Sequence, residues 1–445
     1  MKKVGFVSLG CPKNLLDSEV MLGHLTRSGY QLVQNPEEAE VLVVNTCGFI
    51  EAAKQESIDT ILEMAKHKTN GNCRRLVVTG CLAQRYAQDI ARDIPEVDVV
   101  FGLDQLDTVV DACESGERRV ENVRADGSAA YLYDHLAPRV LTTPSHYAYL
   151  KISEGCDYPC TFCIIPKIRG SYRSRDPESI LAEAESLAAQ GVKELVLIAQ
   201  DTTRYGAELG LKHGLASVLR QLSKIEGIEW VRFLYAYPTT VDDQVLEALA
   251  SEPKLCRYVD IPLQHASDPI LKAMKRPGTG ASNLALVRRI REAVDGVAVR
   301  SSFIVGFPGE SKSDYEALLR FCAEAELDHL GVFTYSNEEG TGAFNLDNKI
   351  PRRIAVRRRN QLMKEQSKIS AGKLRGMVGR TVRVLLEGRS GESDLLLQGR
   401  MQTQAPDIDG HVLINDAGDQ EPAAGAFYNV EITESLEYDL IGRLA

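Results

Sequence analysis

The sequence contains no hydrophobic segment long enough to cross a membrane and no N-terminal stretch of the length that a signal peptide requires. No apolar run in the 445 residues approaches the roughly 20 that a transmembrane helix needs, and the first apolar stretch, residues 4–9, is far too short for a signal peptide. We therefore expect a soluble, cytoplasmic protein that does not associate with membranes. Disordered and collagen-like chains are excluded, because 44% of the residues are apolar.

Positive charge is also in deficit, with 52 Lys and Arg against 62 Asp and Glu and a formal net charge of −10. A protein with this net charge repels the phosphate backbone of nucleic acids over most of its surface, so only a local basic patch could bind one. Residues 346–375, expected to be helical, carry a balance of +8 from ten Lys or Arg and two acids. This segment is either a solvated helix or a contact surface.

The ten cysteines do not suit a disulfide framework, because cytosolic thiols stay reduced and clustered ones usually bind metal or act in catalysis. The densest set, here called the loop triad, is Cys156, Cys160 and Cys163 in a C-x3-C-x2-C run. Three thiolates on one loop can hold three irons of a 4Fe-4S cube and leave one iron open to a small chelating molecule. Zinc is the alternative, although a structural zinc site usually adds a fourth Cys or His at short spacing, and the next thirty residues contain neither.

A second set, the upstream triad, follows three apolar strands. The strands cover residues 4–9, 41–45 and 76–79, and each is followed within two residues by a cysteine: Cys11, Cys47 and Cys81. Amphipathic helical stretches lie between them, a rhythm typical of βα units in a parallel sheet, whose carboxyl edge gathers ligands. We therefore expect these thiols to converge, with Gly10, Gly48 and Gly80 leaving room for a bulky cofactor. The alternative is three ordinary buried cysteines near strand ends.

These patterns predict an α/β multidomain chain. We expect an N-terminal parallel-sheet α/β domain at residues 1–112, a connector at 113–144, a second α/β region at 145–375 and a small β-barrel at 376–445. The second region has six strand candidates, at 147–152, 194–199, 230–235, 258–263, 297–305 and 329–335. Six βα units are too few for an eight-stranded barrel, so we expect an open, partial (β/α)6 barrel with the loop triad at its carboxyl mouth.

Three other residues are candidates for cofactor binding at that mouth. Phe162 could stack on an adenine or cap the core. Gly306, in a Gly-Phe-Pro-Gly loop, could let the backbone approach a nucleoside or form a turn. Gln200 ends another strand of the same barrel.

The C-terminal residues 376–445 contain five short strand candidates, which suggests a small β-barrel of the oligonucleotide-binding type. Their charge is −7, from five Arg, no Lys and twelve acids. A barrel of this charge would repel a phosphate backbone, so a basic protein is the more complementary partner.

Over essentially its full length the sequence resembles the radical S-adenosylmethionine methylthiotransferases. The resemblance rests on the loop triad followed by Ile-Ile-Pro-Lys-Ile-Arg-Gly, on the upstream triad and on a C-terminal barrel similar to a TRAM domain. The segments LIAQDTTRYG (197–206) and VFTYSNEEGT (332–341) look closest to the branch that modifies a ribosomal protein. The acidic barrel agrees with that branch, since the sister branch modifies transfer RNA.

The resemblance implies two 4Fe-4S clusters and S-adenosylmethionine as cofactors. The loop triad would hold the cluster that cleaves S-adenosylmethionine to a 5′-deoxyadenosyl radical, and the upstream triad the cluster whose bound sulfur is methylated and delivered. The implied target is the β-carbon of an aspartate in small-subunit ribosomal protein twelve, a very basic protein. An electron-donor protein would be a further partner, and no direct nucleic-acid substrate is expected. Two alternatives stay open: a transfer-RNA adenosine methylthiotransferase, and a non-catalytic metal-binding scaffold on the ribosome.

Overall fold

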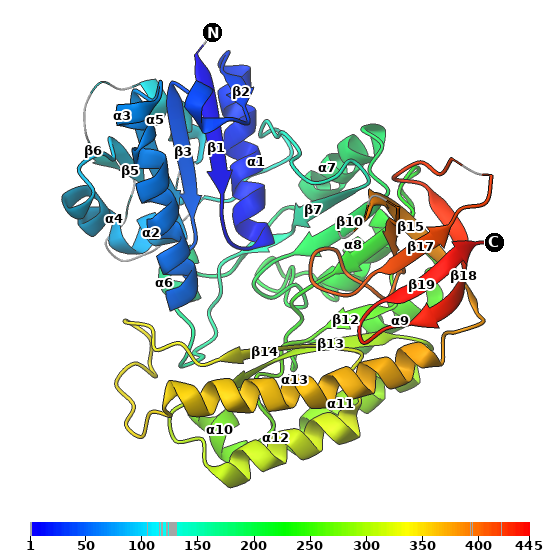
Figure 1. Cartoon of the computed structure of the whole chain (residues 1–445). Coiled ribbons are helices and arrows are strands. Elements are labelled where there is room, and N and C mark those ends of the chain that lie inside the picture. Colours follow the sequence, from blue (N-terminus) through cyan, green and yellow to red (C-terminus); the bar gives the residue numbers. More distant parts are fainter. Residues whose placement is uncertain are drawn as a thin grey trace.

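The structure, a computed structural model, describes residues 2–104, 106–114, 116, 119–121, 123, 131–391, 393, 395–419 and 421–445. Its elements form an N-terminal α/β unit, a central α/β unit and a small C-terminal barrel (Figure 1). No helix in these ranges has the length and hydropathy needed to span a membrane.

The N-terminal unit is a parallel sheet in the order β2-β1-β3-β4-β5-β6. Its strands are β1 (Lys3–Ser8), β2 (Gln31–Val33), β3 (Val41–Thr46), β4 (Arg75–Gly80), β5 (Val99–Phe101) and β6 (Arg119–Glu121). All six residues of β3 are buried, as is typical of a parallel strand covered on both faces. The predicted strands that precede the upstream cysteines are confirmed. The sequence did not predict β2 or β6, and β6 extends this sheet into the proposed connector, which lies partly outside the described residues.

Helices cover both faces of this sheet. α1 (Pro12–Arg27) and α5 (Val109–Glu114) pack on the face that includes Val43, whereas α2 (Glu51–Ala65) and α4 (Cys81–Asp93) pack on the face that includes Val44. Successive strand residues point to opposite faces, so neighbouring valines serve two separate cores. The short elements η1 (Pro36–Glu38), α3 (His67–Asn70) and η2 (Leu106–Thr108) complete the unit.

The central unit contains two adjoining parallel sheets, β11-β10-β7 and β12-β13-β14. Their strands are β7 (Tyr147–Lys151), β10 (Glu194–Ile198), β11 (Trp230–Phe233), β12 (Tyr258–Asp260), β13 (Ala298–Val305) and β14 (His329–Thr334). The sheets meet where the Ala236 N–H donates to the Asp260 carbonyl at 2.8 Å. The strands therefore follow one another in chain order, which confirms the predicted open, partial barrel.

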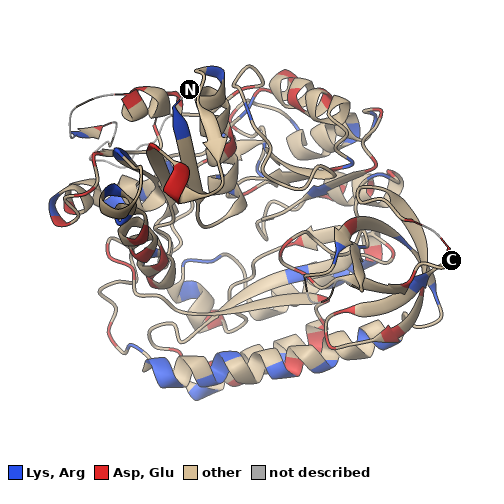
Figure 2. Cartoon of the chain, turned by 45° about the horizontal axis from the view of Figure 1, so that its top comes forward, with Lys and Arg blue, Asp and Glu red and all other residues tan. Residues whose placement is uncertain are grey.

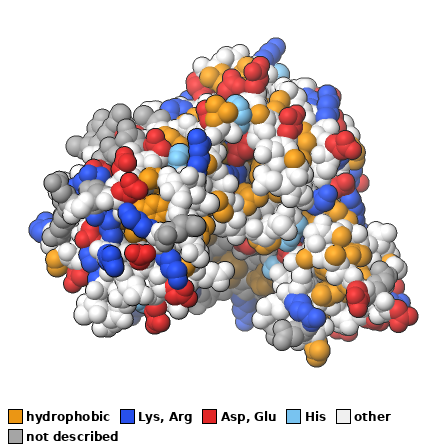
Figure 3. Space-filling view, turned by 90° about the horizontal axis from the view of Figure 1, so that it is seen from above, with side chains coloured by type: hydrophobic (Ala, Val, Ile, Leu, Met, Phe, Trp, Pro, Cys, Tyr) orange, Lys and Arg blue, Asp and Glu red, His pale blue; other side chains and the backbone are white. Residues whose placement is uncertain are grey.

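Helices and one short ribbon surround these strands. The helices are α6 (Ile165–Arg169), α7 (Pro177–Ala189), α8 (Gly214–Leu222), α9 (Asp243–Ser251), α10 (Asp268–Ala273), α11 (Gly280–Ala293), α12 (Lys312–Ala325) and α13 (Arg352–Arg375); the ribbon pairs β8 (Ser153–Glu154) with β9 (Arg173–Ser174). The predicted basic segment forms α13, which packs along β14 and α12 and carries Lys and Arg along its length (Figure 2). On the face drawn in Figure 3, basic and acidic side chains are interspersed.

The C-terminal unit is a closed barrel in the order β15-β16-β17-β19-β18. Its strands are β15 (Thr381–Arg389), β16 (Leu397–Arg400), β17 (Val412–Asp416), β18 (Phe427–Ser435) and β19 (Leu440–Leu444). Side chains such as Val384, Val412 and Val430 alternate inward to form its core. The predicted small barrel is confirmed.

Acidic side chains dock this barrel onto the central unit. The hydroxyls of Tyr147 and Tyr149 donate to Asp407 Oδ2 at 3.0 and 2.9 Å, and the Tyr258 hydroxyl donates to Asp409 Oδ2 at 2.6 Å. These contacts join β7 and β12 to the loop before β17. Asp407 and Asp409, which the sequence analysis counted in the −7 charge of the barrel, thus bind the central unit. Less of that negative charge is therefore available to a binding partner than the composition indicates.

A buried ionic chain strengthens the same junction. Glu194 lies between Arg232 and Arg400 at 2.8 Å from each, and all three side chains are fully buried. Glu387 then contacts Arg400 at 2.6 Å. Burial raises the pKa of Glu387, but the His146 ring and the Arg400 charge outweigh it and lower the pKa to about 2. The carboxylate therefore stays ionised at neutral pH and holds the barrel in place.

The substitution Tyr149→Phe should destabilise the protein by about 0.5–1.5 kcal/mol, because it removes a partly buried hydrogen bond from the tyrosine hydroxyl to the exposed residue Asp407. Urea unfolding followed through the single tryptophan, Trp230, measures the effect, since this side chain packs against Phe427 of the C-terminal barrel. Tyr428→Phe is the control, because that hydroxyl accepts only an exposed backbone N–H, from Ala423. Equal changes in the two variants would contradict the assigned role of the Tyr149 hydroxyl.

Candidate functional site

The upstream triad lies at the carboxyl edge of the N-terminal sheet. Cys11 is the N-cap of α1, Cys47 directly follows β3, and Cys81, directly after β4, begins α4. The loop before α1 approaches β3 closely, since a Cβ built on Gly10 would lie 3.0 Å from Cys47 Sγ. Burial raises the pKa of the Cys81 thiol to about 12; Arg169 opposes this rise, and charge on Cys11 and Cys47 adds to it. The structure thus places the Cys11 loop against Cys47 and the Cys47 loop against Cys81, so the three cysteine-bearing loops adjoin one another.

The glycines beside this triad have a different role from the one expected. A Cβ on Gly48 would lie 2.8 Å from the Cys81 carbonyl oxygen, and one on Gly80, whose φ is +96°, would overlap Asn45 and Thr46. Protein atoms fill the space that the sequence interpretation reserved for a cofactor. The glycines instead allow the cysteine-bearing loops to approach one another.

The loop triad lies at the carboxyl mouth of the central barrel, between β8 and α6. The Cys156 N–H donates to the Gly170 carbonyl at 3.0 Å, and the Cys163 N–H donates to the Cys160 carbonyl at 3.1 Å. Thr161 ties the middle of the loop to the barrel, because its N–H donates to the Met274 carbonyl at 3.0 Å. Burial raises the pKa of Cys156 to about 11 and of Cys163 to about 12.

Aromatic and cationic side chains flank this loop. Tyr158 and Tyr237 stack with ring centroids 3.7 Å apart and planes inclined by 2°. The Arg276 guanidinium lies over Tyr237 at 4.2 Å from its centroid and places Nη1 3.8 Å from Cys160 Sγ. Sequence reasoning missed the site formed by Tyr158, which lies in the cysteine loop, and Arg276, which lies after β12. No local spacing relates two residues so far apart in the chain.

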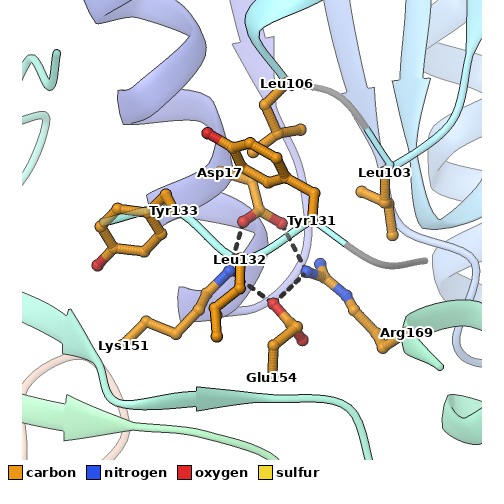
Figure 4. Close-up of a pocket in the computed structure, with 9 residues that line it drawn as sticks. All are labelled: Asp17, Leu103, Leu106, Tyr131, Leu132, Tyr133, Lys151, Glu154 and Arg169. Carbon is orange, nitrogen blue, oxygen red and sulfur yellow. Dashed lines mark hydrogen bonds and ion pairs between the residues drawn. The ribbon is translucent and has the colours of Figure 1, made fainter. Parts of the chain in front are cut away.

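A buried ionic network joins the N-terminal unit to the mouth of the central barrel (Figure 4). Asp17 of α1 contacts Lys151 Nζ at 2.5 Å and Arg169 Nη1 at 2.6 Å, and Glu154 contacts the same two cations at 2.7 and 3.1 Å. Arg169 also points Nη2 at Cys81 Sγ, 3.5 Å away. Asp17 and Cys81 belong to the N-terminal unit, whereas the other three residues belong to the barrel mouth. The network therefore fixes the edge of one unit against the mouth of the other.

Two members of the network, Glu154 and Arg169, stay charged at neutral pH. Burial raises the pKa of Glu154, but Lys151 and Arg169 outweigh it, and the result lies well below the usual value of a glutamate. Likewise burial lowers the pKa of Arg169, but Asp17 and Glu154 raise it well above its ordinary value. Removing one partner of a buried ionic group leaves an uncompensated charge and is strongly destabilising.

The three predicted cofactor contacts occupy different surroundings. Phe162 is partly buried and packs against an apolar cluster of Ile270, Met274, Phe307 and Ala343. Gln200 Nε2 donates to Glu154 Oε1 at 2.6 Å, while its Oε1 is buried and has no hydrogen-bond partner among the described residues. Gly306 has a φ of +79° and donates its N–H to Glu310 Oε2. Their contact with a cofactor remains a prediction.

The triads do not form a compact single-ion site. Among the described residues, no three Cys, His, Asp or Glu side chains lie close enough to hold one metal ion. A single zinc ion would draw its thiolate ligands to about 2.3 Å from one point. Thiolates on a 4Fe-4S cube each bind a different iron and so lie farther apart.

Three family models match the chain in the order of its structural units. They are an uncharacterized family designated UPF0004 at residues 3–102, the radical SAM superfamily at residues 150–322 and the TRAM domain at residues 378–445. The matched regions contain the N-terminal sheet, the central strands with the loop triad, and the C-terminal barrel, respectively.

Solved structures share this fold. The methyltransferase TsrM of Kitasatospora setae, with cobalamin and a [4Fe-4S] cluster bound, superposes with a TM-score of 0.54 over 77% of each chain, at 15% identity. Similarity at this level shows a common fold alone. It supports the sheet-plus-partial-barrel arrangement derived above.

Curated relatives are similar over the full length. The chain is 52% identical to the "ribosomal protein uS12 methylthiotransferase RimO" of Solibacter usitatus, over 99% of this chain and 94% of that protein. It is 48% identical to the protein of the same name in Koribacter versatilis and 46% identical to that of Geobacter sulfurreducens, over 100% of this chain in both cases and 96% and 98% of those proteins. The chain therefore belongs to the RimO branch of the radical S-adenosylmethionine methylthiotransferase family.

Proposed function

We propose that this protein transfers a methylthio group to the β-carbon of an aspartate in ribosomal protein uS12, the small-subunit protein twelve. The observation that carries the proposal is the pair of three-cysteine groups, one at the carboxyl edge of the N-terminal sheet and one at the mouth of the central barrel, in two units that a buried ionic network joins. Relatives of the same length and domain order carry the name of this activity. A methylthio transfer requires two chemical operations, and the chain supplies two sites within one rigid frame.

The residues present fit two 4Fe-4S clusters, one on the loop triad and one on the upstream triad. Both groups offer thiols only, and the raised pKa values of Cys81 and Cys163 mean that iron must displace the proton of these thiols on binding. When bound, the clusters and S-adenosylmethionine supply the electron, the hydrogen-abstracting radical and the methyl group. Arg276 beside Cys160 and Arg169 beside Cys81 would offset the negative charge of the thiolates.

We further propose that S-adenosylmethionine binds at the barrel mouth beside the loop triad. The stacked rings of Tyr158 and Tyr237 form a rigid flat wall there. The buried and unpartnered Oε1 of Gln200 fits a polar contact to this cofactor, and Phe162 and Gly306 are the other contacts we propose. An electron-donor protein would supply the reducing electron, and the reaction would take place in the cytoplasm.

Mass spectrometry of uS12 tests the proposed substrate. In cells that lack this protein, uS12 should lose the mass of one methylthio group, and the wild-type gene should restore it whereas a Cys163→Ala gene should not. Transfer-RNA nucleosides from the same cells are analysed in parallel. An unchanged uS12 together with a lost transfer-RNA methylthio group would contradict the proposal. Failure of the purified protein to cleave S-adenosylmethionine would instead favour a non-catalytic scaffold.

A further inference from the structure

Lys13 is a largely buried lysine with no direct ion-pair partner among the described residues. It lies in the first turn of α1, two residues after Cys11, and is only 8% exposed. Among the described residues, none forms an ion pair or hydrogen bond with its ammonium group. Buried lysines are almost always paired, because removing an ammonium from water is costly. This side chain therefore points to a ligand.

Cys11, Asp260 and Glu154 act on the ammonium through their charge, but among the described residues the one direct contact is with an aromatic ring. Lys13 Nζ lies 2.9 Å from the centroid of the Tyr235 ring. Tyr235 follows β11 at the mouth of the central barrel and has a φ of +65°, a conformation that residues other than glycine rarely adopt. Such strained residues gather at functional sites. A cation–π contact leaves the ammonium free to donate hydrogen bonds to an anion.

The nearby carboxylates are already engaged by other groups. Asp260 contacts Arg300 at 2.9 Å and accepts the Tyr235 N–H at 3.0 Å. Glu154 is held by Lys151 and Arg169 in the ionic network. The charges of Asp260 and Glu154 therefore act on Lys13 from a distance, but neither carboxylate pairs with it directly, so a carboxylate that enters from outside would find a free hydrogen-bond donor.

The position of this cation matches the proposed reaction. Lys13 extends from the loop that carries Cys11 of the upstream triad, and Tyr235 belongs to the barrel mouth that carries the loop triad. A group held between them lies at the boundary of the two units. The substrate carbon proposed above is directly bonded to a carboxylate.

We propose that Lys13, supported by the ring of Tyr235, binds the side-chain carboxylate of the target aspartate and so positions its β-carbon between the two triads. This inference rests on the proposed function and adds the residue that selects an aspartate over its neutral amide. Lys13 is a specificity-determining residue in this account. The carboxylate of S-adenosylmethionine has the same chemistry, and the experiment separates the two sources.

The test uses the full-length protein with reconstituted clusters and purified uS12 in two forms, native and with the target aspartate replaced by asparagine. Dissociation constants are measured for the wild-type enzyme and for Lys13→Met and Lys13→Arg. The wild-type enzyme should bind the aspartate form about 10- to 100-fold more tightly than the asparagine form. Lys13→Met should abolish this preference, and Lys13→Arg should keep much of it. Lys2→Met is the matched control, because Lys2 is an exposed lysine near the Tyr30 ring.

The ratio of the two dissociation constants is measured within one enzyme preparation, so partial loading with iron does not affect it. If Lys13→Met fails to fold, Lys13→Gln replaces it. An unchanged preference in Lys13→Met, or no preference in the wild-type enzyme, would overturn the inference while uS12 methylthiolation stands. The inference would also be overturned if Lys13→Met kept the preference for the aspartate form but lost methyl transfer from S-adenosylmethionine in the absence of uS12. That result would assign Lys13 to binding of the cofactor. If the wild-type enzyme fails to modify uS12 at all, the proposed function itself is wrong.

Discussion

Cys47→Ala should lower the iron content of the reconstituted protein from about eight to about four irons per chain, the loss of one cube of two. Methylthiolation of uS12 should disappear, whereas reductive cleavage of S-adenosylmethionine should continue. The physical reason is the separation of the two thiol groups: Cys47 ends β3 of the N-terminal sheet, and the loop triad is held by the central barrel through Gly170 and Met274. Removal of one thiol should therefore empty only its own site.

Iron and sulfide analysis, together with chromatography of 5′-deoxyadenosine, measures this prediction. Cys73→Ala is the matched control, because Cys73 is also buried in the N-terminal unit but donates its thiol to the Arg75 carbonyl at 3.2 Å. That variant should keep all its iron. Cys163→Ala should give the reciprocal result, with about four irons and no cleavage of S-adenosylmethionine. About four irons in the unaltered protein would refute the upstream site.

Arg169→Met should destabilise the protein by about 3–5 kcal/mol, because it leaves the buried carboxylates of Asp17 and Glu154 with a single cation, Lys151. The loss should also loosen the contact between the N-terminal sheet and the central barrel, since Arg169 contacts both Asp17 and Cys81. We expect methylthio transfer to fall more than cleavage of S-adenosylmethionine, because only transfer requires the two sites to keep their relative position.

Urea unfolding of the unreconstituted protein measures the stability effect without interference from iron. Arg92→Met provides a control in which an arginine again loses two carboxylates, Asp89 at 2.8 Å and Asp93 at 2.7 Å, on the exposed surface of α4. Solvent screens such pairs, so this variant should unfold almost like the wild type. Similar unfolding midpoints for Arg169→Met and Arg92→Met would show that the buried network does not hold the units together.

Local pattern in the sequence predicted the three-unit fold and placed the cysteines at strand ends. The strands before Cys11, Cys47 and Cys81 are continuous apolar runs, and a buried parallel strand requires such a run whatever lies elsewhere in the chain. Short or weakly apolar strands escaped, as with β2 and β6 at the sheet edges, where two of three β2 residues are exposed. The expected role of Gly48 was wrong, because only the folded chain shows that Leu82 and the Cys81 carbonyl fill the space beside it.

By itself, the sequence determined where the long buried strands form, which thiols follow them and which family the chain resembles, because those signals span a few tens of residues. Tertiary structure alone decided that Asp17 meets Lys151, that Asp407 receives two tyrosine hydroxyls and that Lys13 is buried against the ring of Tyr235. These pairs join residues more than a hundred positions apart, as between Asp17 and Lys151. Charge pairing across such a distance follows from how the units pack, and no local periodicity encodes it.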